Sequence, residues 1–115
     1  MCCRLVCTIP EVVKYYGFFD NPHGIILKSY DNNLHDYIML DSRNQEELSL
    51  DHQFSFAIDI AKAIDHIHNQ DVVHFDIKPL NILLEKDNVS SLYRCVVTDF
   101  GVSYTRQSQI KKPLI

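Results

Sequence analysis

Two short strings of polar residues stand out, because together they carry two carboxylates, an amide and an ammonium group. The first runs from His74 to Asn81 (HFDIKPLN), and the second, Asp99-Phe100-Gly101, begins 18 positions after Asn81. Loops on a rigid scaffold can direct such side chains at one point. Phosphoryl transfer needs this set: a carboxylate that accepts the proton of an attacking hydroxyl, a second carboxylate and an amide oxygen for Mg²⁺, and a cation near the transferred group.

Both strings resemble signatures of the protein kinase superfamily, the catalytic loop H-R-D-x-x-x-x-N and the D-F-G motif. The flanking segments follow the family's order. Residues 12–19 (VVKYYGFF) resemble the fourth strand of the small lobe, residues 25–38 the fifth strand, hinge and following helix, and residues 54–68 the long helix before the catalytic loop. The resemblance implies an α+β fold, two-lobed and protein kinase-like but incomplete. Residues 1–33 would be small-lobe strands and hinge, and residues 34–115 large-lobe helices, catalytic loop and DFG segment.

The resemblance also implies roles for the polar residues, position by position. Asp76 would be the catalytic carboxylate, Lys78 the loop lysine near the γ-phosphate, and Asn81 a residue of the catalytic loop that holds a metal ion. Asp99 would be the principal Mg²⁺ ligand. Lysine two places after the aspartate resembles the Ser/Thr-directed kinases rather than the tyrosine-specific ones.

Five further residues match the adenine site of the family. Leu83 matches the apolar floor under adenine and Leu27 the gatekeeper beside it. Lys28, Ser29 and Tyr30 match the hinge, whose backbone hydrogen-bonds the base. The implied cofactors are therefore ATP and Mg²⁺, and the implied partner is a protein that carries the accepting Ser or Thr.

Departures from the family bear on activity. Phe75 stands where arginine is usual, and we expect it to pack against apolar neighbours. His74 and Phe100, with Tyr15, match the family's stacked apolar spine. The 115 residues contain no G-x-G-x-x-G, no V-A-I-K lysine and no A-P-E, so we expect the chain alone to be weakly active or inactive. An alternative function is a kinase fragment or pseudokinase-like module that binds proteins without turnover.

Composition limits the other function classes. The 115 residues are 46% hydrophobic and 23% charged, which predicts one folded unit with a core. The net charge of −4 argues against a nucleic-acid partner, and no stretch is long enough to span a membrane. Four cysteines (Cys2, Cys3, Cys7 and Cys95) suit a reducing, cytoplasmic location better than a disulfide framework. A zinc site or palmitoylation at the first cysteines are weaker alternatives. The oligomeric state stays open.

Local patterns predict the elements that position these residues. Residues 11–19 and 24–30 are expected to form an antiparallel pair of strands around a turn at residues 20–22. Asn33 is expected to cap a helix that begins at Leu34. Residues 54–68 should form a helix, and residues 93–98 a strand. The helix stripe expected to face the core consists of Phe54, Ala57, Ala61, Ile64 and Ile67, with Ile58 and Ala63 widening it.

Overall fold

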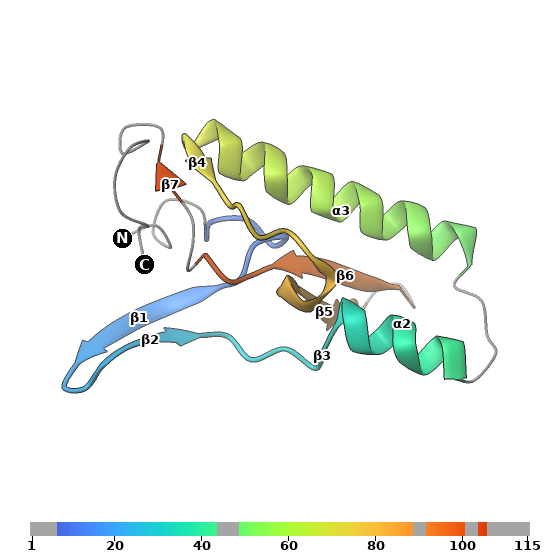
Figure 1. Ribbon diagram of the computed structural model, residues 1–115, viewed down its shortest axis with the longest axis horizontal. Coiled ribbons are helices and arrows are strands. Elements are labelled where there is room, and N and C mark those ends of the chain that lie inside the picture. Colours follow the sequence, from blue (N-terminus) through green and yellow to red (C-terminus); the bar gives the residue numbers. More distant parts are fainter. Residues whose placement is uncertain (1–6, 44–48, 89–91, 101–103, 106–115) are drawn as a thin grey trace.

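The structure is a computed structural model that describes residues 7–43, 49–88, 92–100 and 104–105. Its elements in chain order are β1 (Tyr15–Asp20), β2 (His23–Leu27), β3 (Asn32–Asn33), α2 (Leu34–Arg43), α3 (Leu50–Asn69), β4 (Val72–Val73), the 3-10 helix η1 (Pro79–Asn81), β5 (Ile82–Lys86), β6 (Tyr93–Val97) and β7 (Tyr104–Thr105). Figure 1 shows α3 lying along the β5–β6 pair, while the β1–β2 hairpin extends away from it. Two helices with antiparallel strand pairs give the expected α+β fold.

The β1–β2 hairpin confirms the predicted antiparallel pair but begins later than expected. Phe18 pairs with Ile25 and Asp20 with His23, and a bulge separates Tyr15 from Gly17. The residues before β1 instead lie beside β6, where Val12 forms an isolated parallel bridge with Val97. Their β-branched side chains are buried there, so the apolar run marks a core segment rather than the start of the hairpin.

The core forms between α3 and the three-stranded sheet β3-β5-β6. In β6 three consecutive residues are buried, which is the pattern of a strand covered on both faces. β5 and β6 form an antiparallel ladder that runs from the Ile82–Val97 pair to the Lys86–Tyr93 pair. The buried apolar residues are Val12, Val13, Leu34, Phe56, Ala63, Ile67, Val72, Ile82, Leu84, Cys95, Val96, Val97 and Phe100.

The face that α3 turns to the core differs from the predicted stripe. Phe56, Ala63 and Ile67 are buried, and Ile60 packs against them from the same side. Phe54 is 59% exposed and Ile58 is 54% exposed. Ala57 and Ala61 are exposed as well, so the prediction was wrong for these four residues. Apolar residues cover more than one side of this helix, and periodicity alone could not choose between overlapping stripes.

Both helices begin at a capping side chain. Asn33 Oδ1 accepts the N–H of Asp36 at 2.9 Å, and Asn33 Nδ2 donates to Asp36 Oδ2, which confirms the predicted cap of α2. Ser49 accepts the N–H of His52 and starts α3 four residues before the predicted position. Among the described residues, no helix is both long and apolar enough to cross a bilayer.

A carboxylate on α3 holds this helix to β6. Asp59 Oδ2 accepts the backbone N–H of Cys95 at 3.0 Å, although its place on the helix had suggested an exposed residue. Burial raises the pKa of Asp59, and the hydrogen bond from Cys95 opposes that rise. Burial and the neighbouring Asp59 raise the pKa of the Cys95 thiol to about 12, so this thiol is a packing residue rather than a nucleophile.

We predict that Asp59→Asn changes how stability depends on pH. The raised pKa means that folding favours the protonated carboxyl, so its contribution is largest at acid pH and is lost as pH rises above the ordinary value of 3.8. Asparagine keeps an oxygen for the Cys95 N–H but has no charge to desolvate. Urea unfolding between about pH 4 and pH 7 should show the parent losing stability relative to Asp59→Asn. A difference that stays constant with pH would contradict this.

Candidate active site

The loop between β4 and η1 brings the three predicted catalytic residues together. Asn81 Nδ2 donates to the backbone oxygen of Asp76 at 2.9 Å and to its carboxylate Oδ2 at 3.0 Å. The other carboxylate oxygen of Asp76 lies 3.6 Å from Lys78 Nζ. Pro79 stands in the first turn of η1, where its missing N–H is no loss, and Asn81 N–H closes this turn on the Lys78 carbonyl at 2.8 Å.

Asn81 is buried, and its hydrogen bonds fix which way its amide points. Both donors of Nδ2 are directed at Asp76, so Oδ1 faces the other way. Within the part of the chain that the structure describes, Oδ1 accepts no hydrogen bond. The amide oxygen is therefore available to a ligand from outside the protein.

His74 connects the two polar strings. Its ring is buried; Nδ1 accepts the N–H of Asp76 at 3.1 Å, and Nε2 lies 2.8 Å from the carbonyl oxygen of Thr98. These partners require a neutral ring with its proton on Nε2, which donates to Thr98. The His74 ring also meets Phe100 edge to face, with centroids 4.9 Å apart, as expected of the apolar spine. Tyr15, the third expected member, has a buried hydroxyl.

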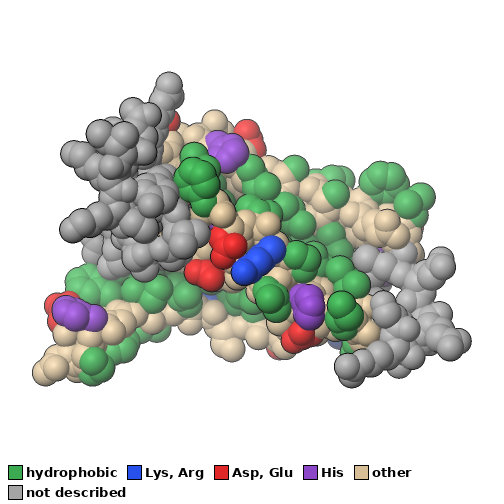
Figure 2. Space-filling model, in the orientation of Figure 1, with side chains coloured by type: hydrophobic (Ala, Val, Ile, Leu, Met, Phe, Trp, Pro, Cys, Tyr) green, Lys and Arg blue, Asp and Glu red, His purple; other side chains and the backbone are tan. Residues whose placement is uncertain are grey.

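Asp99 directly follows Thr98, the residue whose carbonyl oxygen is hydrogen-bonded to the His74 ring. The N–H of Thr98 donates to the Asn81 carbonyl at 3.0 Å, which brings the end of β6 against η1. Asp99 is exposed and has a φ of 64°, a left-handed conformation that aspartate tolerates better than most residues. Figure 2 shows acidic side chains beside a basic one near the middle of one face, in agreement with an exposed charged site.

The donor set at this site fits a magnesium ion. A carboxylate from Asp99 and the Oδ1 atom of Asn81 are hard oxygen ligands, and Mg²⁺ commonly takes only one or two carboxylates and fills its shell with phosphate oxygens and water. Among the described residues, this site included, no three His, Cys, Asp or Glu side chains come together as a metal cluster, so the protein would supply only these two ligands. The alternative zinc site would use Cys2, Cys3 and Cys7, and palmitoylation would use Cys2 and Cys3. Cys2 and Cys3 lie outside the described residues, whereas Cys7 lies within them.

The residues predicted to hold adenine lie along β2, the segment after it, and β5. Leu27 and Leu83 are half-buried and pack against the core. The Lys28 N–H donates to the Lys14 carbonyl at 2.9 Å, so this donor is already used. Its side chain and that of Tyr30 turn to a separate cavity, whereas Ser29 is exposed. That the backbone of Lys28, Ser29 and Tyr30 hydrogen-bonds adenine stays a prediction.

Phe75 differs from its prediction. Its side chain is 66% exposed and its φ is 69°, so it does not pack into an apolar environment as expected. The reason is local. His74 turns inward to reach Thr98, and the positive φ of Phe75 directs the Phe75 side chain outward.

Sequence reasoning missed a cluster of charges behind the predicted hinge. Lys28 Nζ lies 2.9 Å from Glu85 Oε2, and Arg94 Nη1 lies 3.6 Å from Glu85 Oε1. The bond to Glu85 raises the pKa of Lys28. Because Lys28 and Glu85 are 57 positions apart, no local pattern joins them. Glu85 and Arg94 lie side by side because they are paired across β5 and β6.

The chain is similar in sequence to known proteins over most of its length. The model of the family described as "Protein kinase domain" matches residues 3–113. A probable receptor-like protein kinase of Arabidopsis thaliana is 32% identical over 111 residues, 90% of this chain and 30% of its own length. The proto-oncogene serine/threonine-protein kinase mos of Rattus norvegicus is 32% identical over 101 residues, 81% of this chain and 28% of its own length.

A receptor-like serine/threonine-protein kinase of Arabidopsis thaliana is similar to the same degree, with 33% identity over 109 residues. These residues are 89% of this chain but 16% of the relative. The chain thus spans less than a third of the length of each of these relatives.

Proposed function

This chain belongs to the protein kinase domain family, and from that membership we propose that its site binds ATP with Mg²⁺ and serves transfer of the γ-phosphate to Ser or Thr hydroxyls of proteins. The observation that carries the proposal is the set of Asp76, Asn81 and Lys78, in which Asp76 is hydrogen-bonded to Asn81 and paired with Lys78, with Asp99 joined to it through Thr98. Relatives named as serine/threonine kinases and the lysine at position 78 support the choice of hydroxyl.

Asp76 is the proposed proton acceptor. As the substrate hydroxyl oxygen forms its bond to the γ-phosphorus, the bond from that phosphorus to the bridging oxygen of ADP breaks and the hydroxyl proton moves to the Asp76 carboxylate. Asn81 holds this carboxylate from one side and Lys78 from the other, so the side chain has few alternative orientations. Lys78 is half-exposed, which leaves its ammonium able to face the transferred phosphoryl group.

Asn81 and Asp99 are the proposed Mg²⁺ ligands. An ion held by these two residues would neutralise negative charge that develops on the phosphate groups. Asn81 contributes the amide oxygen that its own hydrogen bonds to Asp76 leave open. The base would lie between Leu27 and Leu83 and pair with the Lys28 carbonyl and the Tyr30 N–H, since the Lys28 N–H is bonded to Lys14.

We propose that the 115-residue chain by itself transfers phosphate poorly, because its sequence has no glycine-rich loop and no V-A-I-K lysine. The second candidate, a module that binds proteins without turnover, is favoured by one observation. Large apolar side chains are exposed along the β1–β2 hairpin, among them Tyr16, Phe18 and Ile26.

We predict that the chain binds ATP weakly, in the micromolar to millimolar range, and only with Mg²⁺, and that Asp99→Asn lowers this affinity about tenfold or more. Asparagine suits the positive φ at this position, so the variant removes the charge without straining the backbone. Asp71→Asn is the matched control, because Asp71 is also an exposed aspartate at a positive φ of 58°.

Isothermal titration calorimetry with and without Mg²⁺ measures both effects. Equal losses in Asp99→Asn and Asp71→Asn would mean that general charge, not a metal ligand, is responsible. Tight binding of ATP without Mg²⁺ would overturn the proposed role of Asn81 and Asp99.

A further inference from the structure

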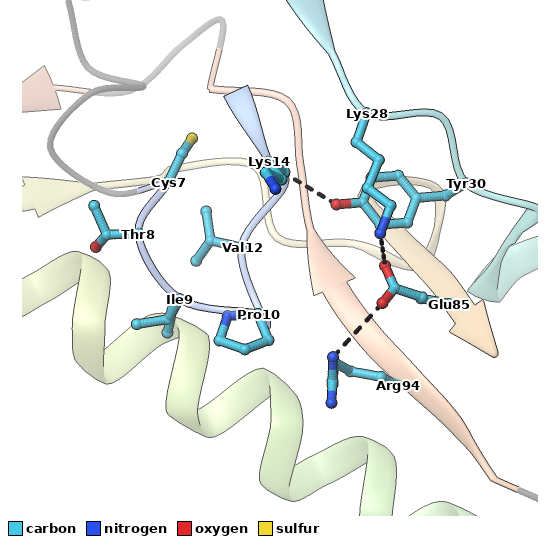
Figure 3. A pocket seen from close by; sticks show the side chains of 10 residues that line it. All are labelled: Cys7, Thr8, Ile9, Pro10, Val12, Lys14, Lys28, Tyr30, Glu85 and Arg94. Carbon is cyan, nitrogen blue, oxygen red and sulfur yellow. Dashed lines mark hydrogen bonds and ion pairs between the residues drawn. The ribbon is translucent and has the colours of Figure 1, made fainter. Parts of the chain in front are cut away.

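A cavity of about 330 Å³ lies on the side of the predicted hinge where the Lys28 and Tyr30 side chains point. Its walls come from the segment before β1, from the residues after β2, and from the β5–β6 hairpin, as Figure 3 shows. The lining residues are Cys7, Thr8, Ile9, Pro10, Val12, Lys14, Lys28, Tyr30, Glu85 and Arg94. None of the residues proposed for Mg²⁺ or proton transfer lines it.

One wall of the cavity carries more positive than negative charge. In Figure 3 Lys28 and Arg94 approach Glu85 from opposite sides and share its carboxylate. Lys14 is the third basic lining residue, and its backbone N–H donates to the Tyr30 hydroxyl at 3.1 Å. Three basic side chains against one carboxylate leave an excess of 3 − 1 = +2 among the lining residues. Of the three, Lys28 and Arg94 lie at Glu85, whereas the Lys14 ammonium lies 5.4 Å from the centroid of the Tyr16 ring.

Most N–H groups of the Arg94 guanidinium have no partner among the described residues. Its guanidinium carries five N–H groups, yet among the described residues its one ion pair is with Glu85, at 3.6 Å and through a single nitrogen. The planar guanidinium can donate two parallel hydrogen bonds to phosphate or carboxylate oxygens, and that geometry is better than its single long contact with Glu85. Its side chain is partly exposed, so these donors can reach an incoming anion.

The opposite wall is apolar. Ile9, Pro10 and Val12 line it, and Figure 3 shows them across the cavity from Glu85. Val12 is buried and held by its bridge to Val97, and Ile9 packs against the core, whereas Pro10 is exposed. A ligand that fills the cavity therefore needs an anionic end and an apolar body.

We propose that this cavity binds a small-molecule phosphate monoester, with the phosphate at Lys28 and Arg94 and an apolar group against Ile9, Pro10 and Val12. Near neutral pH such a monoester is close to a dianion, which balances the excess of two positive charges on the lining. The site shares Lys28 and Tyr30 with the proposed hinge, but it lies on the side to which their side chains turn and is lined by none of Asp76, Lys78, Asn81 and Asp99.

The test is a titration of the 115-residue chain with phenyl phosphate, without Mg²⁺ or nucleotide, followed by amide NMR shifts. We expect saturable shifts around Lys28 and Arg94. Arg94→Gln should weaken binding about tenfold or more, because it removes a charged hydrogen bond. Lys86→Gln is the control, since Lys86 is an exposed neighbour on β5 that does not line the cavity.

Glu85→Gln is the decisive variant, because it should strengthen binding about three- to tenfold by releasing Lys28 and Arg94 from their shared carboxylate. Loss of fold cannot imitate a gain in affinity. Inorganic phosphate should bind more weakly than phenyl phosphate, because it leaves the apolar wall uncovered. No saturable binding, equal affinity in Arg94→Gln, weaker binding in Glu85→Gln, or equal binding of inorganic phosphate would each overturn the proposal. These outcomes are independent of Mg²⁺ and Asp99.

Discussion

Asp76→Asn should lower phosphoryl transfer to a Ser/Thr peptide by about 10²- to 10⁴-fold, the range over which a positioned proton acceptor acts. The amide keeps the size of the side chain and an oxygen for the Asn81 Nδ2 donor, but it cannot accept the hydroxyl proton. The loss should therefore fall on the rate of the chemical step and leave ATP affinity nearly unchanged.

The measurement needs a chain in which the remaining kinase segments are present. Residues 1–115 can replace the matching segment of the rat mos kinase, to which they are 32% identical over 101 residues. Transfer of radiolabelled phosphate is then compared among the parent chimera, Asp76→Asn and the control Asp65→Asn, an exposed aspartate on α3. A chimera that folds and binds ATP but transfers nothing would favour the module without turnover. Full activity in Asp76→Asn would exclude Asp76 as the proton acceptor.

Leu84→Ala should lower the free energy of unfolding by about 2 to 5 kcal/mol, which is a large part of the total for a small domain. Leu84 is 0% exposed and sits on the central strand β5 of the three-stranded sheet, paired with Asn32 on one side and Cys95 on the other. Neighbours on both sides are held by the ladder, so the cavity left by the truncation cannot easily collapse.

Leu40→Ala is the matched control, because Leu40 is 52% exposed on α2 and alanine is a good helix former. Urea unfolding followed by circular dichroism should give a change within about 0.5 kcal/mol for this variant. Similar losses at Leu40 and Leu84 would mean that the core does not lie where the burial of β5 places it.

The order and type of most elements could be predicted from local patterns, whereas their faces and exact starts could not. The Asn33 cap was predicted because a polar side chain stood directly before a helical pattern. The start of α3 was missed because Leu50 is followed by polar residues, and this segment becomes helical only when the Ser49 side chain caps it. Phe54 was assigned to the wrong face because the choice between apolar stripes is made by the sheet, which lies far away in the sequence.

The same distinction holds for the site. Asp76, Lys78 and Asn81 lie within five residues of one another, so a short signature could place them together. The cluster of Lys28, Glu85 and Arg94 depends on how the segment after β2 lies against the β5–β6 hairpin, and nothing local encodes that contact. Phe75 was misplaced for a similar reason, since its exposure follows from the inward turn of His74.

The buried His74 ring has a consequence for how the two polar strings move. Because one ring holds the Asp76 N–H, the Thr98 carbonyl and the face of Phe100, opening either string breaks contacts of the other. The strings are therefore expected to open and close as one cooperative unit rather than as two independent loops. A ligand that binds to Asp99 alone would then also restrict the positions that the Asp76 side chain can adopt, although the ligand does not contact Asp76.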